Sequence, residues 1–411
     1  MDNPKERFFS VTDNLFTFSS FACDCVTDIE NIKPGEVKET VKMQCLPDKP
    51  IRFAFAPNRG MVRLAKTGAI NSGHILTELI AIRDGNKESL FSFFSEYGFF
   101  FPIDTDDYEA LDMDSLFGMV NRIKAVVDLM SSTSEARKDY KKILGLTLYL
   151  LFTHPIELYL SCFEQPFKTY EHQLYTEFES ISALFRHSVH EPELIDAYDG
   201  AGYTIKDSIF SPTYKVKHED FSNIVGGYDE TCVGSKTSVL FKEITRLYCN
   251  STDLSTELRR AIELIFHFQH SIAVIKNYLS DGSLEFYDTD ENVKRRYLEN
   301  FNDNMKQALV DVAKIVIRDE VGYNIGGMRP HYDISTMSPA WEIQDLLTGI
   351  YVSIFFMRPG VELYRKCNNP SCDRLFLVNT TSAKRKYCSS SCRNANAQRA
   401  HRFRKLSSVQ T

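Results

Sequence analysis

The chain has 411 residues, with 48 Lys and Arg against 55 Asp and Glu, so its formal net charge is −7. Over the whole chain, this acidic balance is unlike the basic excess typical of proteins that bind nucleic acid. Hydrophobic residues make up 43% and charged residues 25%, which are ordinary globular values that exclude wholesale disorder. At roughly 150 residues per domain, the length predicts two or three folding units.

The N-terminal sequence has no feature of an export signal. Residues 1–7 are charged, and no long apolar stretch follows them. The most apolar run, residues 143–152, has ten residues, whereas a membrane-spanning helix needs ~20, so a buried helix is predicted. We therefore expect a cytoplasmic protein that does not bind membranes, with cysteines that are mostly reduced.

The first 70 residues have the pattern of short strands and turns. Apolar and polar residues alternate over 51–55, a turn follows at 57–60, and a second strand resumes at 61–64. This region predicts a small β element near the N-terminus.

Helical spacing begins after this element and predicts three helices in succession. The first covers residues 74–84. Asn86 can cap the second, and Gly98 offers its C-terminal stop. The third covers 115–130, where apolar residues recur at helical spacing.

The rest of the body also has a helical pattern, with one interruption. Residues 135–190 predict two or three helices rich in aromatic residues, and 190–235 is loop-like. Further helices are predicted at 236–248, 256–279, 291–320 and 340–357. The predicted fold class is mainly α with a small N-terminal β element. We expect an acidic body over 1–360, with two subdomains dividing near 190–235, and a separate module over 361–411.

Four of the ten cysteines lie close together in this last module. Cys367 and Cys372 form a Cys-x4-Cys pair, and after fifteen intervening residues Cys388 and Cys392 form a Cys-x3-Cys pair. Zn²⁺ takes four tetrahedral ligands, and each close pair of thiolates can hold it from one side. Four unrelated buried thiols would be the alternative. The pairing predicts one structural zinc ion, because four thiolates leave no position for a reactive water.

The order of the predicted elements in this module is that of a treble clef. A knuckle at Cys372 leads into a strand, a strand returns at 385–387, and a helix then carries Cys392 in its first turn. The predicted fold is therefore a treble-clef-like zinc finger, a β-hairpin plus a helix.

Positive charge is concentrated on the same segment. Residues 365–405 hold 11 Lys and Arg and one acid, Asp373, for a net +10, which leaves 37 basic and 54 acidic residues, a net −17, elsewhere. A basic helix on a small zinc module suits contact with phosphates. The predicted contacts are Lys384, Arg385, Lys386, Arg393, Arg399, Arg402, Arg404 and Lys405. Docking of this tail on acidic protein, in the same chain or a partner, is the alternative.

The finger sequence resembles a known family. The residues around Cys367 and Cys372, the run 386–394 and the later arginines are similar to the CGNR-type zinc finger. Here its signature tetrapeptide is Cys392-Arg393-Asn394-Ala395. In bacterial proteins of that family, the finger follows a helical domain often named ABATE, which residues 74–103 and 341–357 also resemble. The resemblance implies a bacterial, stress-responsive transcriptional regulator.

Other constellations in the sequence are weaker. Glu263, His267 and His270 can share one helix face and bind a metal, but their aromatic neighbours favour histidines of the core. The loop that begins at Gly326–Gly327 and runs to Tyr332 has the pattern of a connecting turn. No Ser–His–Asp, Cys–His or paired-carboxylate arrangement can be assigned, so no enzymatic activity is predicted.

Together these features predict a DNA-binding transcriptional regulator. The helical body would dimerise, bind a small effector of unknown identity or dock a partner. RNA binding is one alternative, and a protein-interaction module whose basic finger docks on acidic protein is another. An enzyme within 155–335 would belong to a further class.

Overall fold

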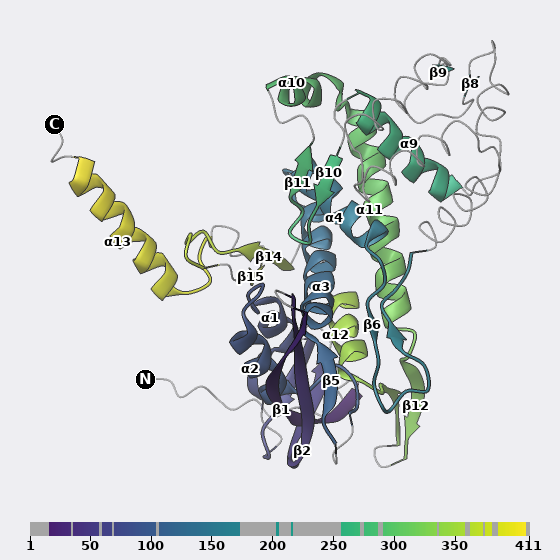
Figure 1. Ribbon diagram of the computed structural model, residues 1–411, viewed down its shortest axis with the longest axis vertical. Helices are drawn as coiled ribbons and strands as arrows, with labels where there is room; N and C mark the ends of the chain where they lie inside the picture. The colour runs from purple at the N-terminus through teal and green to yellow at the C-terminus, as the bar shows by residue number, and fades with distance from the viewer. Residues whose placement is uncertain are drawn as a thin grey trace. The chain divides into compact units, whose positions relative to one another are not determined.

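The computed structural model describes most of the chain (Figure 1). The described residues are 16–33, 36–56, 60–67, 70–103, 107–172, 203–204, 215–216, 256–271, 275–286, 291–334, 337–357, 362–372, 375–379 and 385–407. The chain divides into two compact units. Unit 1 consists of Met1–Val127, Pro155–Tyr170 and Val321–Thr411, and unit 2 of Asp128–His154 and Glu171–Glu320. The predicted boundary at residue 360 remains a prediction.

Unit 1 begins with an antiparallel five-stranded sheet. Its strands are β1 (Phe16–Lys33), β2 (Glu36–Ala56), β3 (Gly60–Leu64), β4 (Ile70–His74) and β5 (Glu109–Asp112). They are ordered β1-β2-β3-β4, and β5 pairs with β2. Ile51, Phe53 and Phe55 are buried on one face, as the alternation predicts, while on the other face Arg52 is exposed and Ala54 is buried. The N-terminal β element is therefore confirmed, and its first two strands of 18 and 21 residues are longer than expected.

Helices cover this sheet. They are α1 (Ile75–Ile80), α2 (Lys87–Tyr97) and α12 (Leu346–Phe355), and the first part of α3 (Met113–Ser134) belongs to the same unit. In Figure 1, α2 lies against β1. Helix α12 packs on β3, where the Met61 backbone N–H donates to Ser353 Oγ at 3.2 Å. Phe94, Phe99 and Phe100 are fully buried in contact with one another, which places the core of this unit between sheet and helices.

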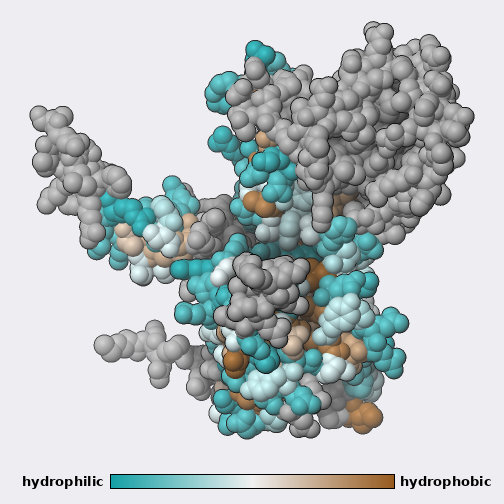
Figure 2. Space-filling model, viewed as in Figure 1, coloured by the Kyte–Doolittle hydropathy of each residue, from teal (hydrophilic) through white to brown (hydrophobic). Residues whose placement is uncertain are grey.

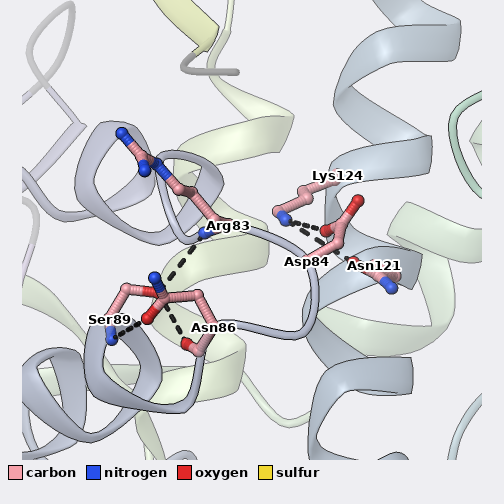
Figure 3. A network of polar contacts seen from close by, with 6 residues as sticks. All are labelled: Arg83, Asp84, Asn86, Ser89, Asn121 and Lys124. Atoms are coloured by element: carbon pink, nitrogen blue, oxygen red, sulfur yellow. Dashed lines mark hydrogen bonds and ion pairs between the residues drawn. The ribbon is translucent and has the colours of Figure 1, made fainter. Parts of the chain in front are cut away.

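The turn between α1 and α2 forms by local chemistry (Figure 3). Asn86 caps α2 by accepting a hydrogen bond from the Ser89 backbone N–H at 2.9 Å. Lys124 on α3 donates to the Asp84 carboxylate at 2.6 Å, so the turn is also joined to a neighbouring helix. Gly98 ends α2 with a φ of 84°, a conformation that favours glycine. The predicted start and stop of this helix are both confirmed.

Unit 2 contains the remainder of α3 and further helices with short hairpins. Its elements are α4 (Tyr140–Phe152), β8 (Tyr203–Thr204), β9 (Lys215–Val216), α9 (Thr256–Ser271), β10 (Ile275–Tyr278), β11 (Leu284–Phe286), α10 (Glu291–Asn300) and most of α11 (Asp303–Asn324). The apolar run 143–152 lies in α4 and is almost wholly buried, which confirms the predicted buried helix. The Phe268 ring contacts the rings of Phe286, Tyr297 and Phe301, so α9, α10 and the β10–β11 hairpin share a core.

Two predicted helices are partly strand. The helix predicted over 256–279 ends at Ser271, and 275–278 is β10. The turn Asp281–Gly282 explains this: Gly282 has a φ of 82° and Asp281 accepts from the Ser283 N–H, which closes a hairpin instead of extending a helix. The helix predicted over 340–357 begins only at Leu346.

The loop predicted from Gly326 does begin with a turn, over 325–327, but it continues into a strand, and the helix predicted to start at 340 does not form within residues 329–342. They contain an antiparallel hairpin of β12 (Arg329–Asp333) and β13 (Ser338–Glu342). Trp341 pairs with Pro330 and Ala340 with His331 across the hairpin, so these residues are held in a strand and cannot form the first turn of a helix. Likewise β6 (Glu157–Leu158) and β7 (Phe167–Lys168) replace part of the helical pattern predicted for 135–190. In the predicted loop 190–235 the structure describes one short antiparallel pair, β8 with β9, while the rest of this loop and the helix predicted at 236–248 lie outside the described residues.

Within the described residues, none of the helices combines the length and the apolar character that crossing a membrane requires.

Candidate metal centre and basic finger

The finger is built from one hairpin and one helix. Strands β14 (Glu362–Lys366) and β15 (Leu375–Asn379) pair antiparallel, with Lys366 opposite Leu375, and helix α13 covers Ser390–Ser407. Cys367 directly follows β14 and Cys372 precedes β15, so the loop of the hairpin carries the first cysteine pair. Cys392 lies in the first turn of α13, as predicted.

The strand pairing differs from the predicted one. We expected 375–378 to pair with a strand at 385–387, but β15 pairs with β14, which precedes the first cysteine. Residues 385–387 form no strand and meet the knuckle through one backbone bond, in which the Asn368 N–H donates to Lys386 O at 2.9 Å. The physical reason is the metal centre, because Cys367 and Cys372 reach the common sulfur cluster from the two ends of one loop, which brings β14 beside β15.

The four cysteines converge on one point. Their Sγ atoms all lie within 4.8 Å of one another, with 3.7 Å between Cys372 and Cys388 and 3.5 Å between Cys388 and Cys392. Tetrahedral zinc with Zn–S bonds of about 2.3 Å places its sulfur ligands about 3.8 Å apart, so these thiols fit the ion. Cys367, Cys372, Cys388 and Cys392 form a single zinc site, and their four thiolates close its coordination sphere.

The surroundings of the sulfurs shift the pKa values of two ligand thiols in opposite directions. Hydrogen bonds, first from Asn369 and then from Ser389, lower the pKa of the Cys392 thiol to about 6. Burial raises the pKa of Cys388 to about 12, and the neighbouring thiols add to this effect. The Cys388 backbone N–H points to Cys367 Sγ at 3.5 Å. Such donors orient metal ligands and stabilise their charge, although no pattern in the sequence identified Asn369 or Ser389 as part of the site.

Helix α13 is joined to the knuckle by side chains as well as by Cys392. Arg399 donates to Asn369 Oδ1 at 3.5 Å and also to the Ser371 hydroxyl. Asn396 Nδ2 donates to the Tyr387 hydroxyl at 2.8 Å. The first three turns of the helix are therefore held in place beside the metal centre.

The predicted phosphate contacts fall into three groups. Arg385 donates to the carbonyl oxygens of Tyr387 (3.2 Å) and Cys388 (2.6 Å), and its guanidinium lies 5.2 Å from the centre of the Phe376 ring, so like Arg399 it stabilises the finger itself. Lys386 and Arg393 are exposed, and within the described part of the chain neither forms an ion pair. The third group lies outside the described set. It consists of the side chains of Arg402, Arg404 and Lys405, which belong to α13, and the whole residue Lys384. In Figure 2 the described part of the finger carries many hydrophilic side chains.

The second candidate metal site, on α9, lies partly outside the described residues. Glu263 is buried on α9, while the side chains of His267 and His270 lie outside the described residues. In unit 2, the structure does place His172 Nε2 3.1 Å from Glu320 Oε2, with both side chains buried. These residues are 148 positions apart, so no local pattern could predict the pair. Among the residues that the structure describes, the four cysteines are the one group with metal-ligand geometry.

Comparison with known proteins gives one match, over the finger. Residues 364–405 match the family model of the CGNR zinc finger. No curated protein and no solved structure matches the chain. The match covers the metal centre and α13 but not units 1 and 2 upstream of residue 364.

Proposed function

Because residues 364–405 are a CGNR zinc finger, we propose that this module binds duplex DNA and that the protein is a transcriptional regulator. The observation that supports this proposal is that Lys386, just before α13, and Arg393, on α13, are both exposed. Side-chain hydrogen bonds to the residues around the zinc site keep this helix in place. Only one acidic residue stands against eleven basic ones over 365–405, so the field around the finger attracts phosphates. The hairpin knuckle followed by a helix also supports a treble-clef-like fold.

The described cations of the finger have two different roles: two arginines stabilise the finger, and two exposed cations are available to DNA. Arg399 donates hydrogen bonds to the knuckle, and Arg385 donates to the 385–388 segment. These bonds position α13. Lys386 and Arg393 then contact the DNA backbone, and the arginines of the later turns extend the contact along the helix. Phosphate contacts of this kind set affinity and register, and base contacts would add specificity.

The remainder of the chain, residues 1–360, is the proposed sensor or dimerisation part of the regulator. In this proposal the protein works in the cytoplasm, where a reducing environment keeps four zinc-binding thiols available.

Salt dependence of binding tests the proposal. Full-length protein should bind duplex DNA with an affinity that falls linearly on a log–log plot against salt, with a slope of about −0.9 per neutralised phosphate. The double variant Lys386→Gln/Arg393→Gln should bind more weakly and lower the magnitude of this slope by about 2, one for each lost contact. Fluorescence anisotropy with a labelled duplex measures both quantities.

A matched control comes from unit 2. Lys294 and Arg295 are exposed on α10, so Lys294→Gln/Arg295→Gln removes the same charge from the protein without changing the finger. This variant should bind DNA as the wild type does. If it weakens binding equally, or if no duplex is bound at low salt, DNA contact by the finger is wrong.

RNA binding is less well supported by the described side chains. Recognition of single-stranded RNA uses exposed aromatic rings on which bases stack. Phe376 is buried beside the cysteines and the Tyr387 hydroxyl is bonded to Asn396, so neither ring is presented for stacking. Parallel titrations with single-stranded RNA, structured RNA and duplex DNA distinguish RNA binding from DNA binding. A tighter complex with RNA than with duplex DNA would favour the RNA alternative. An acidic protein fragment as competitor tests docking on protein.

A further inference from the structure

Unit 2 contains a pocket whose charge differs from that of the acidic body around it. Its volume is about 370 Å³, and it is formed by the end of α3, the start of α4 and the first half of α11. Three lysines line it, together with a tyrosine, a glutamine and one acid: Lys138, Lys306, Lys314, Tyr140, Gln307 and Asp303. Outside 365–405 the chain has a net charge of −17, whereas the side chains that line this pocket carry three ammonium groups and one carboxylate.

The ion pairs that Lys306 and Lys314 already form are weak. Lys306 pairs with Asp303 at 2.9 Å one turn away on α11, and the Asp303 side chain is 98% exposed. Lys314 lies 3.9 Å from Asp311, again on the helix surface. Ion pairs of this exposed, single-turn type are screened by water and contribute little, so an incoming anion can displace them.

The spacing of the lysines sets the kind of ligand. Lys306 and Lys314 are eight residues apart on one face of α11, which corresponds to about 12 Å along a helix, while Lys138 approaches from the α3–α4 connection. One small monovalent anion cannot reach all three ammonium groups. Lys306 also lies 5.8 Å from the centre of the Tyr140 ring, so an aromatic face borders the charged part.

We infer that this pocket binds a small organic anion with several negatively charged oxygens. Such a ligand relieves the repulsion among lysines that face a common cavity, and charge-assisted hydrogen bonds from ammonium groups are strong. The volume lies within the range of metabolite sites, about 300–1,000 Å³. Phosphate esters and di- or tricarboxylates share this chemistry. The pocket supplies an effector site of defined ligand class, and it does not depend on the finger binding DNA.

Isothermal titration calorimetry on the full-length protein tests the inference. The probes are ATP, pyrophosphate and citrate, with adenosine as the uncharged control. Saturable binding of at least one anion is expected, and tighter binding of ATP and pyrophosphate than of citrate assigns the site to phosphates, whereas the reverse order assigns it to carboxylates. Lys306→Gln/Lys314→Gln should weaken that binding by about tenfold or more, because two charge-assisted contacts are lost.

Three further variants test whether the anion binds in this pocket. Asp303→Asn removes the one acid of the pocket and should tighten binding about threefold, because the carboxylate no longer repels the ligand. Anions can also collect on the basic finger, so Lys386→Gln/Arg393→Gln is titrated in parallel and should retain the binding. Lys294→Gln is the matched lysine control.

The inference is overturned if no anion binds saturably, or if the pocket variants bind as the wild type does. It is equally overturned if the finger variant abolishes binding, since the anion then occupies the finger. Neither result bears on duplex DNA binding, which is measured separately.

Discussion

At the scale of single residues, Asn369 shows how the knuckle joins metal binding to the position of a helix. It is a buried polar side chain that acts on the Cys392 thiol and accepts from Arg399 of α13. One side chain thereby stabilises a zinc ligand and orients the segment proposed to contact DNA. Groups in this position around a metal are nearly as important as the ligands themselves.

Replacing Asn369 should therefore weaken zinc binding without removing any ligand. Asn369→Ala is expected to lower the affinity for zinc by about tenfold, the lower end of the effect of such outer partners. Competition with a chromogenic chelator measures it. The neighbouring Asn368 is exposed and contributes only its backbone N–H, so Asn368→Ala should keep the wild-type affinity. Equal affinities for the two variants would contradict this role of Asn369.

At the scale of elements, close packing in unit 2 depends on a glycine contact between α4 and the β10–β11 hairpin. A Cβ atom added at Gly145 would lie 2.2 Å from the carbonyl oxygen of Gly282, which is backbone and cannot rotate away. Gly322 on α11 differs, because a Cβ there would meet nothing within 4 Å. Replacing glycine by alanine should therefore destabilise the protein at Gly145 and stabilise it at Gly322.

Gly145→Ala should lower the free energy of unfolding by about 1–3 kcal/mol, because the hairpin must move to relieve the overlap. Gly322→Ala should raise it by about 0.5–1 kcal/mol, because alanine has a higher helix propensity than glycine. Urea unfolding followed by circular dichroism measures both. If Gly145→Ala were as stable as the wild type, the close approach of α4 and the hairpin would be wrong.

Helix α12 offers a prediction on pH dependence. The Asp345 carboxylate caps this helix by accepting from the Thr348 N–H at 2.6 Å, and burial raises the pKa of Asp345 above its ordinary value of 3.8. The folded protein therefore binds this proton more tightly than the unfolded chain does. The contribution of Asp345 to stability consequently declines as pH rises from 3.8 through the raised pKa.

Asp345→Asn keeps a capping oxygen but carries no charge. Its stability relative to the wild type should increase as the pH is raised from 4 to 7, and Asp345→Ala, which has no cap, should be about 1 kcal/mol less stable than Asp345→Asn. Fluorescence of Trp341, the single tryptophan of the chain, follows the unfolding of unit 1. A stability difference between Asp345→Asn and wild type that did not vary with pH would contradict the raised pKa.

At the scale of the whole molecule, the chain combines parts of opposite charge and different means of stabilisation. Unit 2 and the rest of unit 1 have extensive apolar cores, whereas the buried apolar side chains among the described residues of the finger are Cys367, Cys372 and Phe376, with a few neighbours packed on them. Small modules with so little core depend on a structural metal. The net charge of −7 is likewise an average over a −17 body and a +10 finger segment.

Loss of zinc should therefore unfold the finger alone. Cys388→Ser is expected to reduce bound zinc from about one ion per chain to near zero and to expose 364–405 to protease, because the folding free energy of such modules comes from the metal. Unit 2 and the part of unit 1 that precedes the finger should keep their thermal transitions. Cys162→Ser, at an exposed thiol outside the cluster, is the matched control and should retain zinc. Unchanged metal content in Cys388→Ser would contradict the assigned ligands.

The sequence by itself determined the features that depend on near neighbours. The zinc ligands follow from two close cysteine pairs, the cap at Asn86 and the stop at Gly98 from residues within one turn, and the charge division from simple counting. Backbone reach and side-chain chemistry act over a few residues in these cases, so the pattern is sufficient.

Only the tertiary structure decided which distant residues meet. It paired β15 with β14, assigned Arg385 and Arg399 to holding the finger while Lys386 and Arg393 stay exposed, and joined His172 to Glu320. It also placed Lys138 opposite Lys306 and Lys314 around one pocket. Each of these contacts depends on how elements pack, and packing energies are summed over many weak contacts that no local pattern encodes.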